Sequence, residues 1–450
     1  MTKPTQRTSQ TAISSLPLPP GTVGLPLLGE NLEFVQSPNK FLNKRRAKYG
    51  DVFRSNILGN NTVFVGTPEA NHWVFAGENK YLINQWTKAI SLLLGKNGVA
   101  MLTGEAHAKR RAQLAPHFKH DAMSTFVASI QKIAERHLQQ WADASGETSV
   151  VERVRTMAFE IITVFIFGDT VIDIPYLSRL FQTWTGGMFD PLPMELPFTP
   201  FGKAMLAKKE MLEYLAPIVA KRMEMQEQPF DILGSMLSVR DENNEALSLE
   251  TILHEVQVQL FAGHDTTVTA LSNLMMLLAQ NPEVLQSARD EQKSCAHLKV
   301  IDLEAIKSMP YLEQVINEGL RLIPPVNGAF RMATEDISYG GYRIPKGWTV
   351  LYSPSVTHRI LPWTNSTQFD PDRFSSERAE HKQKQFSYIP FGGGPRMCLG
   401  RNFALVEMNI IMALLLRGYH WELTPNQDLT LRSLPFPLPK SGVRVIFSQI

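Results

Sequence analysis

The pattern of apolar and polar positions divides the chain into a short β-rich part and a long helical part. Two runs that alternate apolar and polar residues, DVFRSNIL and NTVFVG, flank Gly59-Asn60-Asn61, and this arrangement predicts a hairpin. From residue 67 to about residue 300, apolar residues recur every three or four positions, which predicts helices. The clearest helical stretches are 107–118, 124–142, 155–168 and 202–226.

The longest helical pattern begins near Ser248 and ends at Asn281-Pro282. Serine is a favourable N-cap and proline cannot continue a helix, so both ends are predicted from the residues alone. At a rise of about 1.5 Å per residue, this helix would span on the order of 45–50 Å. It is apolar on nearly all sides between Val256 and Leu278, so we predict that it runs through the middle of the protein.

The rest of the chain completes the predicted architecture. GGYRIPKGWTVLYS at 340–353 predicts strand, turn and strand, and a final helix is expected to start at or just after Cys398 and to end near Gly418. Residues 1–15 are polar and rich in Ser and Thr, so we predict a disordered tail, followed by an extended PLPPG segment. Since no repeat or linker divides residues 16–450, we predict one large domain. It is mainly α with small β sheets, and its N-terminal part is rich in β structure.

The composition of the 450 residues is that of a globular protein, with 44% apolar and 20% charged residues. A formal net charge of +2 gives no sign of nucleic-acid binding. Two cysteines exclude a disulfide framework and cannot supply the four thiolates of an iron–sulfur cluster. No signal peptide and no run of the roughly 18 apolar residues of a membrane span is visible. We therefore predict a soluble, cytoplasmic monomer without a transmembrane anchor, and leave peripheral membrane contact open.

One of the two cysteines, Cys398, lies in the stretch PFGGGPRMCLG just before the final predicted helix. A thiol at a helix N-terminus and close to Arg396 is predicted to be held as thiolate. Glycines 392–394 let the backbone approach something flat and bulky, and Phe391 can shield the sulfur from water. A single soft thiolate held in this way suits an axial ligand of iron. The alternative is a structural cysteine in a glycine-rich loop.

Four motifs follow one another in the order and spacing of a known family. Residues 391–400 carry Phe391-x-x-Gly394-x-Arg396-x-Cys398-x-Gly400, and the others are AGHDTT at 262–267, EGLR at 318–321 and FDPDRF at 369–374. Together they resemble the motifs of the cytochrome P-450 haem-thiolate monooxygenases. The resemblance extends over nearly the whole chain. It implies the P-450 fold, in which haem b lies between a long central helix and the loop that carries the Cys ligand, with O₂ as co-substrate.

The resemblance implies how the proximal side of the haem is built. Cys398 would be the axial ligand, because a thiolate donates electron density to iron and favours O–O cleavage. Glu318, Arg321 and Arg373 would form a buried charge network that fixes this side of the site. The resemblance implies the following haem contacts: Cys398, His107, Arg111, Arg331, Arg396, Phe391, Gly392 and Gly400.

Within this set, four side chains resemble the partners of the two haem propionates. His107 and Arg111 lie four residues apart and therefore on one face of a helix, and Arg331 and Arg396 come from later segments. Lys109 and Arg110, between the first two, are expected to be solvated.

On the opposite side of the haem, Asp265 and Thr266 resemble the acid–alcohol pair that delivers protons to bound O₂. Ala262 and Gly263 have little side chain, which would leave room for O₂ and substrate beside the helix. Thr267 is instead expected to bond back to the carbonyl four residues earlier. Since the chain has no GxGxxG fingerprint and too few cysteines for a fused ferredoxin, a separate ferredoxin or flavoprotein is expected to supply the electrons.

Within the family, PPVNGAFR, YRIPKGW and THRILPWTNSTQFDPDRF are most similar to the cyanobacterial and animal retinoic-acid hydroxylases. This similarity implies hydroxylation of a retinoid-like apolar molecule, with Trp86 matching a tryptophan of those enzymes. Where they carry a cation, this chain has Ser91, so retinal, retinol or another apolar terpenoid is an alternative to a carboxylate. The candidate pocket residues are Trp86, Phe181, Trp184, Phe189, Ala262 and Gly263.

Two other hypotheses use the same haem site. One is a peroxide-driven oxygenase or an isomerase that needs no external reductant. The other is a haem-based protein that binds a ligand without converting it.

Overall fold

A computed structural model describes residues 13–450 except 26–28, 145, 191–192, 241–243 and 433. Most of the predicted disordered tail, residues 1–12, lies outside the described residues. Ile13, at its end, is buried, and its carbonyl accepts a hydrogen bond from the N–H of Leu16. The chain is therefore packed against the fold from Ile13, three residues before the predicted start of the domain at residue 16.

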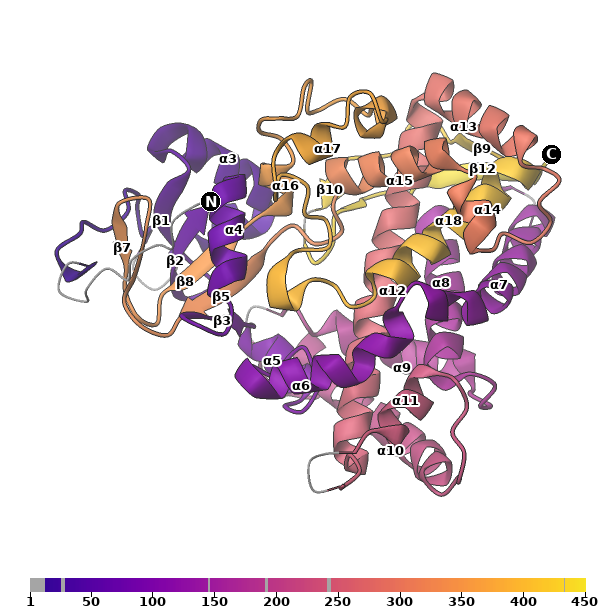
Figure 1. Cartoon of the computed structure of the whole chain (residues 1–450), viewed down its shortest axis with the longest axis horizontal. Coiled ribbons are helices and arrows are strands. Elements are labelled where there is room, and N and C mark those ends of the chain that lie inside the picture. The colour runs from indigo at the N-terminus through magenta and orange to yellow at the C-terminus, as the bar shows by residue number, and fades with distance from the viewer. Residues whose placement is uncertain (1–12, 26–28, 145, 191–192, 241–243, 433) are drawn as a thin grey trace.

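A five-stranded sheet combines strands from residues 52–85 with strands from residues 329–352 (Figure 1). Its strands, in spatial order, are β1 (Val52–Ile57), β2 (Asn60–Val65), β8 (Thr349–Tyr352), β5 (Ala329–Ala333) and β3 (Leu82–Gln85). The predicted hairpin is confirmed, but its turn consists of Leu58 and Gly59, whose φ angles are 51° and 76°. Two successive residues of positive φ match the twist of the strands, and β2 already begins at Asn60.

Smaller sheets complete the β structure. The segment 340–353 does form two strands, β7 (Tyr342–Ile344) and β8, but they pair with different partners, β7 with β6 (Ile337–Tyr339) and β8 with β2 and β5. The remaining strands are β4 (Glu147–Ser149), β9 (Tyr419–Leu423), β10 (Leu431–Arg432), β11 (Leu438–Pro439) and β12 (Arg444–Gln449).

Helices make up the larger part of the molecule, on the right of Figure 1. Three helices flank the sheet: α2 (Asn31–Gln36), α3 (Pro38–Tyr49) and α4 (Pro68–Gly77). The helical part contains α5 (Lys88–Leu94), α6 (Gly104–Leu114), α7 (Ser124–Asp143), α8 (Val150–Phe167), α9 (Ile174–Gly186), α10 (Pro200–Met223), α11 (Ile232–Ser238), α12 (Leu249–Gln280), α13 (Pro282–Ser294), α14 (Leu303–Lys307), α15 (Pro310–Leu322) and α18 (Arg401–Gly418). Short turns of helix are α16 (Pro354–Thr357), α17 (Glu380–Gln383), η1 (Ala115–Phe118), η2 (Asp121–Met123), η3 (Pro371–Phe374) and η4 (Gly394–Arg396).

The predicted central helix is confirmed as α12, which runs through the middle of the helical part (Figure 1). Its 32 residues start after Ser248, whose hydroxyl accepts a hydrogen bond from the N–H of Thr251, and end at Gln280, just before Asn281. At about 1.5 Å per residue the helix is on the order of 48 Å long. It packs along α8, and α18 crosses it (Figure 1). The central helix and the helix that follows Cys398 therefore lie in contact inside one core.

Candidate functional site

The glycine-rich loop before Cys398 is held tightly against the sheet side of the molecule. Gly392 and Gly394 adopt φ angles of 70° and 63°, a region that favours glycine. A Cβ on Gly393 would come within 2.5 Å of the ring of Phe75, so the loop packs directly on α4. The N–H of Cys398 then donates to the carbonyl of Phe391 at 2.9 Å. These constraints fix the sulfur just ahead of α18.

Cys398 lies in a hollow rather than on an open surface. Its side chain is accessible, yet the atoms packed around it are dense enough for burial to raise the pKa of the thiol. The N–H of Gly400 and the positive charges of Arg111 and Arg401 oppose this rise, but burial outweighs them. An accessible group that is also surrounded by protein lies on the wall of an internal space.

The predicted stabilisation of the thiolate by the protein alone is therefore wrong. Burial favours the neutral thiol, and Arg396 is not among the charges that act on it. The guanidinium of Arg396 instead binds Glu78 and the carbonyl of Leu102. A metal cation bound to the sulfur would supply this stabilisation, because a coordinating thiol is deprotonated.

Besides Cys398, a residue in the middle of the central helix α12 is also accessible. Ala262 is exposed although it lies near the middle of α12, most of whose residues are buried. The hydroxyl of Thr266 donates to the Ala262 carbonyl at 2.6 Å. The back-bond expected of Thr267 is thus made by Thr266, while Thr267 donates to Oε2 of Glu407 on α18 at 3.1 Å. The side chains of these adjacent threonines therefore have different hydrogen-bond acceptors.

Two more predicted site residues, Asp265 and Gly263, lie close to Thr266 on α12, and their surroundings differ. Asp265 is partly exposed, and its carboxylate lies 3.2 Å from Nδ1 of His264. A Cβ on Gly263 would come within 2.5 Å of Cδ1 of Ile162, so this glycine lets α12 pack closely on α8. Gly263 was predicted to leave room for O₂ and substrate. Ile162 fills the space beside Gly263, whereas Ala262, the other residue predicted to leave this room, is exposed.

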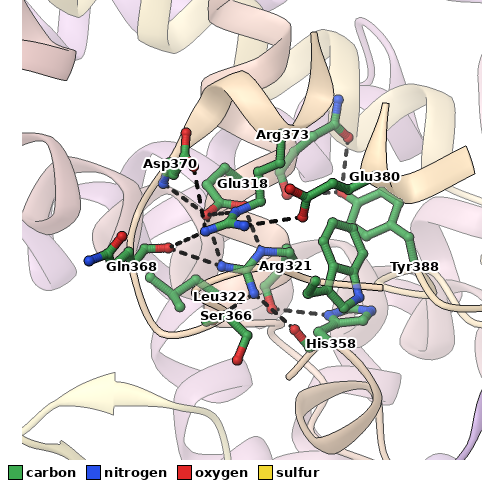
Figure 2. Close-up of polar contacts among 12 residues, drawn as sticks. Glu318, Arg321, Leu322, His358, Ser366, Gln368, Asp370, Arg373, Glu380 and Tyr388 are labelled. Carbon is green, nitrogen blue, oxygen red and sulfur yellow. Dashed lines mark hydrogen bonds and ion pairs between the residues drawn. The ribbon is translucent and has the colours of Figure 1, made fainter. Parts of the chain in front are cut away.

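The predicted charge network of Glu318, Arg321 and Arg373 is present and fully buried (Figure 2). Both carboxylate oxygens of Glu318 accept hydrogen bonds from Arg321, from Nε at 2.6 Å and from Nη2 at 2.8 Å. Nε of Arg373 donates to Oε1 of the same carboxylate at 3.0 Å, and so does the N–H of Asp370 at 2.9 Å. One buried anion thus orders two cations from segments more than 50 residues apart.

Two members of the network were missed in the sequence. Glu380 binds Nη1 of Arg373 at 3.2 Å and Nη2 of Arg378 at 2.7 Å, and its pKa falls to about 2 because its hydrogen bonds outweigh the cost of burial. His358 is buried, which lowers its pKa to about 3. Its neutral ring donates from Nδ1 to the Arg321 carbonyl at 3.0 Å and accepts at Nε2 from the N–H of Ile389 at 2.9 Å. The network therefore reaches Ile389, two residues before Phe391 at the start of the Cys398 loop.

Next to this loop lies a cluster of cations on α6, β5 and η4. His107 is buried and its Nδ1 has no hydrogen-bond partner, while burial and the charges of Arg396 and Arg111 lower its pKa to about 4. Arg111 donates from Nη2 to the Met397 carbonyl at 2.5 Å. A hollow of about 360 Å³ runs along α6 here and is lined by His107, Ala108, Arg111, Ala112, Ala115, Gly394 and Pro395. The structure thus brings α6 to the Cys398 loop, as predicted.

The expectation that Arg110 is solvated is wrong. Its Nη1 donates to Oε1 of Glu255 on α12 at 2.6 Å, and the side chain of Glu255 is completely buried. Burial raises the pKa of Glu255, and the charge of Arg110 opposes the rise. This ion pair ties α6 to the central helix.

The aromatic pocket candidates separate into two groups. Phe181 and Trp184 are fully buried, and Trp184 donates from its indole N–H to the Leu93 carbonyl at 3.2 Å, so both belong to the core rather than to an accessible wall. Trp86 and Phe189 are exposed, and Phe189 lies 5.9 Å from the ring of Phe436. Of these four aromatic residues, only Trp86 and Phe189 can meet a substrate without rearrangement of the core.

These features agree with the comparisons with known proteins. Residues 19–447 match the profile of the family Cytochrome P450. The chain belongs to the cytochrome P450 family. It is 36% identical over 439 residues to putative cytochrome P450 120 of Synechocystis sp., covering 97% of this chain and 98% of the relative. It is 32% identical to cytochrome P450 26B1 of Danio rerio, covering 96% and 87% of the two chains.

A solved structure has the same fold. This structure, described as "Retinoic acid bound cyanobacterial CYP120A1", matches with a TM-score of 0.91 and 36% identity, over 97% of this P450 and 100% of that chain. The predicted mainly helical P450 fold is therefore confirmed. The family also fixes the reaction class: this P450 is a monooxygenase that uses haem b and O₂, with electrons from an external donor and an apolar substrate. Within the part of the chain that the structure describes, no helix has the length and apolarity needed to cross a membrane.

Proposed function

We propose that haem binds between the Cys398 loop and α12, with the sulfur of Cys398 as axial ligand and Ala262 and Thr266 on the opposite side. The observation that carries this proposal is the accessible yet enclosed sulfur, fixed by the glycine-rich loop ahead of α18. The exposed Ala262 in the middle of a buried helix supplies the second wall. A haem held there would supply the activation of O₂, with two electrons from the external donor.

The side chains of the protein have distinct roles in this site. His107, Arg111, Arg331 and Arg396 bind the propionates, since they gather beside the Cys398 loop and His107 has an unpartnered Nδ1. Because the Thr266 hydroxyl donates to the Ala262 carbonyl, its oxygen remains an acceptor. Asp265 is adjacent to Thr266 in the sequence and its side chain is partly exposed, so we assign it the role of the acid that delivers protons together with that hydroxyl. The buried network around Glu318 acts on structure only.

We infer that the substrate is a retinoid or a similar long, apolar terpenoid. The support is the retinoic acid bound to the structural relative and the similarity to cytochrome P450 26B1. Trp86 and Phe189 present exposed aromatic surface for such a molecule. Ser91 offers no positive charge, so retinol and retinal are candidates equal to retinoic acid.

The test is an optical spin-state titration of the ferric protein with retinoic acid, retinal, retinol, palmitate and a steroid. We expect saturable high-spin conversion with at least one retinoid at lower concentration than with palmitate or the steroid. No response to any retinoid, or responses to retinoids no stronger than those to palmitate and the steroid, would refute the retinoid proposal.

The donor is proposed to be a separate ferredoxin or flavoprotein, and the protein to be a cytoplasmic monomer. Substrate-dependent O₂ consumption with a surrogate ferredoxin and its reductase tests the first part. Product formation with peroxide but never with the donor would favour the peroxide-driven alternative.

A further inference from the structure

A single buried carboxylate joins two of the cations that the proposed function assigns to the haem propionates. Glu78 directly follows α4 and is buried. Nε of Arg331, on β5, donates to its Oε2, and Nε of Arg396, in η4, donates to its Oε1 at 2.5 Å. Each carboxylate oxygen therefore holds a different guanidinium, and the two come from segments 253 and 318 residues away along the chain.

The remaining hydrogen bonds of both guanidinium groups fix their orientation. Nη1 of Arg331 donates to Asn84 Oδ1 at 3.2 Å and to the Phe330 carbonyl at 3.0 Å. Nη2 of Arg396 donates to the Leu102 carbonyl at 2.5 Å. Among the described residues, Nη2 of Arg331 and Nη1 of Arg396 have no hydrogen-bond partner. Each arginine thus keeps one oriented donor for an anionic ligand.

The segment that carries Glu78 is itself rigid. Glu78 forms a bridge with Leu82, the N–H of Asn79 donates to the Leu82 carbonyl at 2.8 Å, and the Asn79 side chain accepts from the N–H of Gly104 at 2.9 Å. The carboxylate is therefore in place before any cofactor binds. Without it, two buried guanidinium groups would lose their shared anion and repel each other.

The net charge of the groups around Glu78 is equal in size and opposite in sign to that of the two haem propionates. The charges of four residues act on the pKa of His107, namely Arg396, Arg111, Glu78 and Arg331. These five residues therefore lie in one region. The pKa of His107 is lowered to about 4, so its ring is neutral at pH 7. Three arginines and one glutamate then carry a net charge of +2, equal and opposite to the two propionates of haem b.

We propose that Glu78 is a positioning residue of the haem site: it aims Arg331 and Arg396 at the propionates and reduces the charge of the cation cluster to match them. This inference rests on the haem site proposed above. It predicts that the charge of Glu78, and not only its shape, controls the electron affinity of the haem.

The experiment compares three haem-loaded variants with the wild type. Glu78→Gln keeps the shape and removes the charge, and Glu78→Asp keeps the charge. Glu69→Gln is the matched control, because Glu69 lies on α4, the helix that Glu78 follows, is exposed and pairs with Lys384 at 2.7 Å, away from the cation cluster. The ferric–ferrous reduction potential is measured by spectroelectrochemistry at pH 7, and folding by circular dichroism.

Removal of the Glu78 charge raises the cluster from +2 to +3, which favours the more negative, reduced haem. Loss of this charge would lower the pKa of His107 further, so the histidine stays neutral and cannot compensate. We expect Glu78→Gln to raise the ferrous-to-ferric ratio at a fixed potential about three- to tenfold, a positive shift of about 30–60 mV at 59 mV per decade for one electron. Glu78→Asp and Glu69→Gln should stay close to the wild type.

Each possible outcome either supports or contradicts the proposed role of Glu78. A folded Glu78→Gln variant that loses haem while Glu78→Asp retains it also supports the proposal. An unshifted potential in Glu78→Gln, or an equal shift in Glu78→Gln and Glu78→Asp, contradicts the role proposed for Glu78. The haem site proposed above would stand in either case. A wild-type protein that takes up no haem refutes the proposed function and the role of Glu78 with it.

Discussion

The buried carboxyl of Glu407 predicts an unusual dependence of stability on pH. It lies on α18, is fully buried, and has as its hydrogen-bond donor Thr267 on α12. Burial raises its pKa from 4.5 to about 8, and the hydrogen bond from Thr267 only partly opposes this. Because the folded protein keeps a proton that the unfolded chain releases above pH 4.5, stability should fall as the pH rises from about 4.5 to about 8.

The magnitude follows from the two pKa values. At about 1.4 kcal/mol per unit, a rise from 4.5 to about 8 costs up to about 5 kcal/mol of unfolding free energy above pH 8. Glu407→Gln keeps the shape and the bond to Thr267 but cannot ionise. The variant should match the wild type at pH 5 and exceed it by up to about 5 kcal/mol at pH 9.

The assay is urea unfolding of the haem-loaded proteins, followed by circular dichroism between pH 5 and pH 9. Glu105→Gln serves as the control, since Glu105 is exposed on α6. The control should follow the wild type at every pH. A stability difference between Glu407→Gln and the wild type that stays constant from pH 5 to pH 9 would refute the reasoning.

Three further predictions concern other buried or reactive groups. Glu318→Gln removes the anion that Arg321 and Arg373 share and leaves Glu380 as the buried partner of Arg373, so we expect a loss of about 3–5 kcal/mol in urea unfolding and haem-free protein on purification; a stable, haem-loaded variant contradicts this. Thr266→Val should keep haem and substrate binding but divert electrons to hydrogen peroxide, seen as peroxide formed per electron pair; unaltered coupling speaks against its role. Arg110→Met should destabilise the protein by about 3 kcal/mol, and Arg110→Met with Glu255→Leu should restore part of this; a double variant as unstable as the single one excludes the pair.

Local sequence patterns predicted the parts of the structure that depend on local rules. The ends of α12 follow from Ser248 and from Asn281-Pro282, and the bond between Glu318 and Arg321 follows from their spacing on one helix. The start of α18 shortly after Cys398 follows from the change of a glycine-rich loop into an apolar run. These features need only a few neighbouring residues, so the sequence contains their physical cause.

Partner choice across the fold could not be predicted in the same way. Glu78 and Glu380 are single carboxylates without a distinctive neighbourhood in the sequence, and their arginines become partners only through tertiary packing. Phe181 and Trp184 have the helical spacing of both a core and a pocket wall, so only their burial separates the two. Gly263 looked like space for a ligand, whereas the side chain that occupies this space, Ile162, lies on another helix.

The most direct test of the account is the absorption spectrum of the reduced, carbon-monoxide-bound protein. If Cys398 binds the haem iron as thiolate, the wild type shows the strongly red-shifted Soret band of a thiolate-ligated carbonyl complex, and Cys398→Ala lacks it or contains no haem. The same red-shifted band in haem-loaded Cys398→Ala would contradict the assignment of this sulfur as the ligand.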